Sequence, residues 1–344
     1  MQASYISYQL ELKHPFAIAK FSRTSTPLLL LKLDYEGYTG YGEASMVPYM
    51  GESYGSAVQF LKKVDWSRFR APFDFPEIIA YLDSIESGNP AVKAAIDIGL
   101  NDLQGKILNK ACYEIYNADP SKMPLTSYTI GIDTPEVLKE KILDAKDFKV
   151  LKIKLGRDND RELINTIRSV SDLPLYIDAN QGWIDRKAAI DMIYWLHEQG
   201  AVLIEQPMDK NDLEGNAWIT GRSPIPILAD EAVQRLTDID KIKGAYHGIN
   251  VKLMKSGGMY EAHQMILKAK SLDMKVLIGC MSETSCATLA GIALAPLCNW
   301  ADLDGPWLTS NNPFNAPQMV AGRYILNDLP GLGLEGINAD LFYS

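Results

Sequence analysis

Six charged residues in the middle of the chain each end or interrupt a short apolar run, and their types could support proton transfer beside a metal ion. They are two lysines, three carboxylates and a further lysine: Lys152, Lys154, Asp178, Glu205, Asp230 and Lys252. The intervals from Lys154 to Lys252 are 24, 27, 25 and 22 residues, about the length of a strand, a helix and two loops. Charged residues that end buried strands are costly unless they converge. The series therefore predicts an active site.

The three carboxylates of this series predict a metal site. If Asp178, Glu205 and Asp230 end neighbouring strands, their like charges repel unless a cation lies between them. Oxygen-only ligands favour a hard ion, and Mg²⁺ is the ion expected. Taken singly, each acid could instead lie at a helix N-terminus or in a surface salt bridge. The metal interpretation rests on all three occurring in register.

The lysines predict acid/base chemistry. Strands two and six of an eight-stranded barrel lie opposite each other, so Lys154 and Lys252 would face a substrate from two sides. One lysine can then remove an α-proton and the other can return a proton to the opposite face. Lys152 is two residues from Lys154, on the same strand face. Lys255 is a rival to Lys252, but the pair Gly257-Gly258 favours Lys252 as the strand end.

The elements that must position these residues alternate strictly from about residue 124. Candidate strands are 125–130, 150–155, 175–178, 202–206, 226–230, 248–252, 275–279 and 300–304, with amphipathic segments between them. Eight strands with seven intervening helices predict a (β/α)7β modified TIM barrel, whose strand ends converge at the C-terminal face. The competitor is a doubly wound open sheet. It would not bring strand ends two to six around one point.

The N-terminal part predicts a different kind of unit. Strands are expected near 3–12, 27–35 and 38–44, and helices near 55–63, 76–86 and 90–108. We expect an α+β capping domain over residues 1–120, completed by the C-terminal tail 321–344, with the catalytic barrel at 121–320. The segments 14–27 and 46–55 are expected to be loops that fold over the barrel mouth.

Composition excludes several classes of protein. The formal net charge of −9 over 344 residues, without a basic run, argues against a nucleic-acid binder. The four cysteines lack paired spacing, which favours free thiols in a reducing compartment. We see no signal peptide and no run long enough to span a membrane. A cytoplasmic protein is expected, and barrels of this kind often associate into homo-oligomers. The four histidines show no metal spacing and are assigned no catalysis.

The motifs of this series resemble those of a known family. KIK, IDAN, IEQP, LADE and NVKLMKSGG are similar to the muconate-lactonizing subgroup of the enolase superfamily, and the resemblance extends to the helix PAVKAAIDIGLNDLQGK and covers essentially the whole chain. It implies a capping domain, a (β/α)7β barrel and bound Mg²⁺. By the same resemblance Lys154 and Lys252 are the acid/base pair, Lys152 is an auxiliary electrostatic residue, and the three carboxylates bind the metal.

Further residues bear on the substrate. Asp302 and Asp304 in WADLDGPW share a strand face and suit a substrate ammonium group, although Asp-Gly is also a common turn. This DxD resembles the feature with which dipeptide epimerases bind a dipeptide N-terminus. The resemblance also makes Arg23, with Lys20 as runner-up, a partner for an acidic second side chain. Glu283 is expected to line the site or support Lys252.

The resulting hypothesis is a Mg²⁺-dependent dipeptide epimerase, an isomerase acting on the C-terminal residue of an L-Xaa-Glu-type dipeptide through an enediolate. The first alternative keeps the scaffold: an o-succinylbenzoate synthase, an N-acylamino acid racemase or a cycloisomerase. Their substrates carry no free ammonium group, so Asp302 and Asp304 would lack a role. The second alternative is a catalytically silent ligand-binding barrel, which has no need for two opposed lysines.

Overall fold

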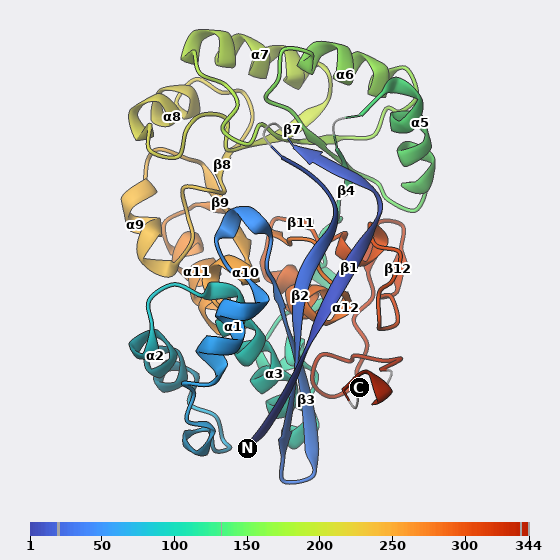
Figure 1. The fold of residues 1–344 in the computed structure, drawn as a ribbon. Helices are drawn as coiled ribbons and strands as arrows, with labels where there is room; N and C mark the ends of the chain where they lie inside the picture. The colour runs from blue at the N-terminus through green and yellow to red at the C-terminus, as the bar shows by residue number, and fades with distance from the viewer. Residues whose placement is uncertain (19–20, 132, 338, 343–344) are drawn as a thin grey trace.

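An antiparallel sheet begins the chain in the computed structural model, which describes residues 1–18, 21–131, 133–337 and 339–342. Its strands are β1 (Gln2–Ile18), β2 (Phe21–Tyr35) and β3 (Tyr38–Ser45), in that order across the sheet. Figure 1 shows β1 and β2 as one long hairpin that rises from the N-terminal unit to the upper part of the barrel.

The expectation of a loop over residues 14–27 is wrong. The strands β1 and β2 continue through most of this segment, and Phe16 pairs with Arg23 across the hairpin after an irregularity between Glu11 and Phe16. The two threonines of SRTST suit a strand, and pairing satisfies backbone groups that a loop would leave to water. The runner-up residue Lys20 lies outside the described residues.

Four helices complete the N-terminal unit: α1 (Tyr54–Leu61), α2 (Phe75–Ile85), α3 (Pro90–Leu108) and α4 (Cys112–Ile115). The long helix α3 packs directly on β3. A Cβ at Gly42 would lie 1.9 Å from the carbonyl oxygen of Ala95, so only glycine permits this approach. The helices α1, α2 and α3 confirm the three that the sequence predicts, within one or two residues at each end.

Eight parallel strands form the second unit, in the sheet order β11-β10-β9-β8-β7-β6-β5-β4. They are β4 (Tyr128–Ile130), β5 (Leu151–Lys154), β6 (Leu175–Asp178), β7 (Ala201–Glu205), β8 (Ile227–Ala229), β9 (Gly248–Lys252), β10 (Lys275–Gly279) and β11 (Trp300–Asp302). A parallel bridge between Thr126 and Ala301 joins the first strand to the last. The sheet is therefore a nearly closed barrel, and the open doubly wound alternative is excluded.

Each of the seven strand connections contains a helix in the described residues (Figure 1). In chain order these are α5 (Pro135–Asp144), α6 (Asp160–Arg168), α7 (Arg186–Glu198), α8 (Leu213–Thr220), α9 (Ile239–Ile242), α10 (Leu253–Ser256) with α11 (Met259–Ser271), and α12 (Ser285–Leu294). Short 3-10 helices add η1 (Pro48–Met50), η2 (Trp66–Arg68), η3 (Pro120–Lys122), η4 (Leu236–Asp238), η5 (Ala295–Leu297), η6 (Gly305–Trp307) and η7 (Ala339–Phe342). The predicted (β/α)7β barrel is confirmed.

The C-terminal segment carries the small hairpin β12 (Met319–Val320) and β13 (Arg323–Tyr324). Beyond it the chain contacts the N-terminal unit: the Leu332 N–H donates to Asp102 at 2.9 Å, and the Phe342 ring lies against Tyr41. The domain boundaries at 120/121 and 320/321 stay a prediction. Among the described residues, no helix is both long and apolar enough to cross a membrane.

Candidate active site

The residues of the site stand on a layer of apolar side chains inside the barrel. That layer is a separate buried cluster of Val150, Tyr176, Leu203, Leu228 and Leu277. Successive side chains of a strand point to opposite faces, so the residue two positions further on points the same way. On four of these strands that residue is Lys152, Asp178, Glu205 or Asp230. Strand periodicity therefore places the predicted residues together in the barrel lumen.

Above this layer is a pocket of about 670 Å³. Eight of the residues that the sequence singles out line it: Arg23, Lys152, Lys154, Asp230, Lys252, Lys255, Asp302 and Asp304. Its wall also includes residues that the sequence did not single out, among them Thr129, Asn180, Lys210, Glu231, Cys280 and Ser282. The pocket lies where the C-terminal ends of the barrel strands converge, as barrel active sites do.

Asp178, Glu205 and Asp230 form a cluster that could hold a cation. One carboxylate oxygen from each lies within 4.8 Å of the others, and all three side chains are buried. Burial and the charge of Asp178 raise the pKa of Glu205 to about 7. A cation between the three acids would favour their ionised forms and offset the repulsion between them. An all-oxygen ligand set suits a hard ion such as Mg²⁺.

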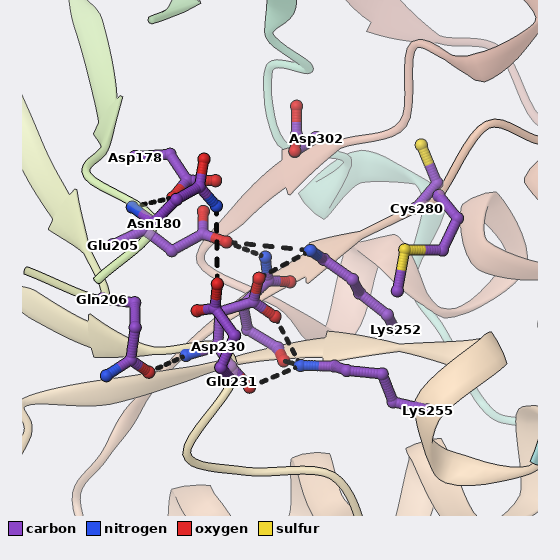
Figure 2. A network of polar contacts seen from close by, with 12 residues as sticks. Asp178, Asn180, Glu205, Gln206, Asp230, Glu231, Lys252, Lys255, Cys280 and Asp302 are labelled. Atoms are coloured by element: carbon purple, nitrogen blue, oxygen red, sulfur yellow. Dashed lines mark hydrogen bonds and ion pairs between the residues drawn. The ribbon is translucent and has the colours of Figure 1, made fainter. Parts of the chain in front are cut away.

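Lys154 and Lys252 approach the cluster from different strands. The Lys154 Nζ lies 2.6 Å from an oxygen of Asp178, and the Lys252 Nζ lies 2.8 Å from an oxygen of Asp230. Their strands, β5 and β9, are four places apart in the eight-strand order and therefore lie on opposite sides of the barrel. Figure 2 shows the Lys252 ammonium group directed toward Asp230 and Glu205.

Lys152 lies deeper than Lys154. Its Nζ is 2.7 Å from Glu205, 2.7 Å from Asp302 and 3.4 Å from Asp178. Burial favours the neutral amine, but the charges of Asp302 and Glu205 outweigh it and hold the pKa of Lys152 well above its usual value. Lys152 is therefore a fixed positive charge. It lies between Glu205 of the three-carboxylate cluster and Asp302 of the DxD pair.

Lys255, the rival to Lys252, is hydrogen-bonded mainly to backbone carbonyl groups. Its Nζ donates to the carbonyl oxygens of Asp230, Val233 and Asn250 and to the Asp230 carboxylate. Figure 2 shows it on the far side of Asp230 from Lys252. These contacts fit a residue that fixes the loop after β8, and they favour Lys252 as the acid/base group.

Two polar side chains that the sequence did not single out hold the residues of this cluster in place. The Asn250 Nδ2 donates to Glu205 at 2.8 Å. Gly279 leaves room for this amide, because a Cβ at that position would lie 2.6 Å from the Asn250 Oδ1. The Gln206 side chain accepts from the N–H of Asp230 at 3.0 Å (Figure 2). Asn250 could have been found, because it stands two residues before Lys252 and so shares its strand face.

Asp302 and Asp304 both line the pocket, in different settings. Asp302 accepts from Lys152 and from the Ser127 hydroxyl, each at 2.7 Å. Asp304 lies just beyond the end of β11 and accepts from the Thr129 N–H at 2.6 Å. Burial and the charge of Asp302 raise the pKa of Asp304 to about 7. A cation beside Asp304 would favour its carboxylate form.

The remaining two predicted residues lie near the turn after β10. Arg23 lines the pocket from the hairpin, and its Nη2 donates to the Ser282 hydroxyl at 2.6 Å. Glu283 is buried and accepts from the Met281 N–H at 2.9 Å, but it is not among the described residues that line the pocket. Burial and the charge of Glu43 raise the pKa of Glu283 to about 8.

The fold and these residues define an enolase-type barrel enzyme, and comparison with known proteins agrees. Residues 136–339 match the family model described as "Enolase C-terminal domain-like". The chain belongs to the enolase superfamily. It is 51% identical over 335 residues to an L-Ala-D/L-Glu epimerase from Bacteroides thetaiotaomicron, covering 97% of this chain and 88% of the relative.

Solved structures show the same relationship. A substrate-liganded L-Ala-D/L-Glu epimerase from Bacillus subtilis matches with a TM-score of 0.90 and 26% identity, over 98% of each chain. A dipeptide epimerase from Enterococcus faecalis, complexed with Mg and the dipeptide L-Leu-L-Tyr, matches with a TM-score of 0.90 and 30% identity, over 97% of this chain and 99% of that one. The resemblance noted in the sequence is thus confirmed.

Proposed function

We propose that this chain is a Mg²⁺-dependent dipeptide epimerase that inverts the α-carbon of the C-terminal residue in L-Xaa-Glu-type dipeptides. The observation that carries the proposal is the placement of Lys154 and Lys252 on opposite strands beside one cluster of three buried carboxylates. A reaction that removes a proton from one face and returns one to the other needs two such groups.

In this proposal the chain's residues have separate tasks. One lysine of the pair takes the α-proton while the other donates a proton to the opposite face, and the roles exchange for the other epimer. Asp178, Glu205 and Asp230 would hold Mg²⁺, which would supply positive charge beside the substrate carboxylate. Lys152 adds a fixed charge beside it.

The DxD pair supports a dipeptide over an N-acylamino acid. Asp302 and Asp304 give the pocket two carboxylates that are not part of the metal cluster, and a free ammonium group is the complementary charge. Arg23 is the proposed partner of the acidic second side chain, since a guanidinium binds a carboxylate through two parallel hydrogen bonds. Relatives of this chain carry names that include L-Ala-D/L-Glu epimerase, which agrees with this substrate class.

The proposal also covers the cellular setting. The four cysteines are free thiols in the structure, as expected in a reducing compartment such as the cytoplasm. The substrate is a small molecule, and neither a nucleic acid nor a membrane is a proposed partner. Association into a homo-oligomer is part of the proposal, and size-exclusion chromatography with light scattering tests it.

The test is mass spectrometry of a dipeptide library incubated with the Mg²⁺-loaded protein in D₂O. Each inversion should leave one deuterium at the α-carbon of the second residue, with the strongest labelling on L-Ala-L-Glu, and a metal chelator should abolish it. Labelling of N-acylamino acids but not dipeptides would contradict the proposed substrate. No labelling of any substrate would instead favour the silent barrel.

The matched variant is Asp302→Asn/Asp304→Asn. If these residues bind the substrate ammonium group, the double variant should lose far more activity toward L-Ala-L-Glu than toward N-acetyl-L-Glu, which has no ammonium group. An equal loss toward both compounds would indicate that the pair supports the fold of the pocket and does not select a dipeptide.

A further inference from the structure

The turn between β10 and α12, residues 280–284, is held by the capping domain as well as by the barrel. Ser282 is its central residue. Its hydroxyl accepts from Arg23 of the hairpin at 2.6 Å, and its carbonyl oxygen accepts from the Ser45 hydroxyl at the end of β3 at 2.7 Å. Ser282 is 7% exposed and lines the pocket. One serine therefore connects two capping-domain strands to the rim of the site.

The turn itself has little freedom to move. The buried carboxylate of Glu43 on β3 accepts from the N–H of Thr284 at 2.9 Å and from that of Ala287 at 3.3 Å, so it caps the start of α12. The Ser45 N–H lies 3.3 Å from the sulfur of Met254. Ser282 is thus a rigid anchor relative to both domains, and Arg23 is the long side chain that rests on it.

We propose that Ser282 is a positioning residue that sets the guanidinium of Arg23 for an acidic second side chain of the substrate. This inference rests on the proposed function and deepens it by naming what fixes the specificity-determining arginine. Arginine loses much rotamer freedom when it is held in one geometry. A partner that fixes it before the substrate arrives removes that cost from binding. A hydroxyl is suited to this task, because it accepts from one of the five N–H donors and leaves the positive charge of the arginine intact.

The alternatives for Ser282 make different predictions. If Ser282 only stabilises the turn, its loss should affect all dipeptides alike. If its hydroxyl acts on the substrate independently of Arg23, its loss should matter equally with and without Arg23. Only a positioning role makes the effect specific to an acidic side chain and dependent on Arg23.

The experiment measures kcat and KM for L-Ala-L-Glu and for its neutral near-isostere L-Ala-L-Gln in four proteins: wild type, Ser282→Ala, Arg23→Met and the double variant. Ser282→Ala should lower the Glu-over-Gln ratio of kcat/KM by roughly tenfold, the size expected for one hydrogen bond to a charged group, mainly through a higher KM for the glutamate substrate. Arg23→Met should abolish the preference, and adding Ser282→Ala to it should change nothing further.

Two further variants control for folding. Ser282→Thr keeps the hydroxyl and should restore most of the preference. Ser285→Ala removes another buried serine hydroxyl nearby, one that accepts from Asn312 at 2.7 Å and is not among the described pocket-lining residues. This variant should leave the ratio as it is in the wild type.

The inference is overturned if Ser282→Ala lowers kcat/KM equally for both dipeptides, if the two substitutions act additively, or if the wild type has no preference for glutamate over glutamine. Failure of the proposed function looks different, because the wild type would then leave both dipeptides without deuterium in D₂O. If the wild type is active and Ser282→Ala has the same Glu-over-Gln ratio of kcat/KM as the wild type, only the positioning role is contradicted.

Discussion

At the scale of single residues, the site is a group of buried charges that satisfy one another. Lys152 lies within 2.7 Å of both Glu205 and Asp302, and Lys154 and Lys252 each contact a carboxylate of the metal cluster. Removing one partner of such a group leaves a buried charge uncompensated. Variants of this site should therefore be judged by the specificity of their defects and not by loss of activity alone.

The lysine pair makes a stereochemical prediction. We expect Lys154→Ala and Lys252→Ala each to lower epimerisation by roughly 10²–10⁴-fold, the usual contribution of a general acid or base. Each variant should still exchange the α-proton of one epimer of L-Ala-Glu with solvent. The epimer that undergoes exchange should differ between the two variants. Proton NMR in D₂O, starting separately from L-Ala-L-Glu and L-Ala-D-Glu, measures both rates. If both variants retain the same epimer, the two lysines do not serve opposite faces.

Asp304 predicts a pH dependence. Burial and the charge of Asp302 raise its pKa to about 7, so its carboxylate form is lost as the pH falls through that value. Because a substrate ammonium group needs the carboxylate, kcat/KM should fall below about pH 7, and Asp304→Asn should remove this part of the profile. The measurement is kcat/KM against pH for both proteins. An unchanged acid limb in the variant would assign it to another group.

At the scale of elements, the turn after β10 carries a buried acid that can be tested through stability. Burial and the charge of Glu43 raise the pKa of Glu283 from 4.5 to about 8. Between these values the folded protein keeps a proton that the unfolded chain has lost, so this group makes the protein less stable as the pH rises. Glu283→Gln cannot ionise, and its melting temperature relative to wild type should therefore increase as the pH rises from 4.5 to 8.

Differential scanning calorimetry at both ends of this pH range measures the effect. Glu77→Gln, at an exposed position in the first turn of α2, is the matched control and should show a nearly constant difference. If Glu283→Gln shows the same constant difference as the control, the carboxyl of Glu283 is not held protonated by its surroundings.

At the scale of the whole molecule, Arg235 joins the capping domain to the barrel. Its guanidinium lies 2.8 Å from Asp83 on α2 and 2.6 Å from Glu261 on α11. Arg235→Met leaves both acids without this partner, and we expect a loss of about 1–3 kcal/mol in the free energy of unfolding. Chemical denaturation measures it. Arg186→Met breaks a pair of 3.6 Å with the exposed Glu214 and should cost little; an equal loss in the two variants would contradict the joining role.

The sequence by itself determined the barrel and the centre of its site. A strand period of two and a βα unit of about 25 residues are local properties, so they show that Lys154, Asp178, Glu205 and Lys252 end successive or opposed strands. The family motifs fall at the same positions. Even Asn250, which was not among the predicted site residues, follows from the same alternation.

Only the tertiary structure decided how the capping domain meets the barrel. The contact between Arg23 and Ser282 spans 259 residues of chain, and no local pattern encodes a partner at that distance. The segment 14–27 was wrongly expected to be a loop. Pairing between β1 and β2 makes most of it strand, and residue propensity alone does not predict that pairing. The proposed specificity residue Arg23 lies at this junction of two domains, beside side chains that folding alone brings together.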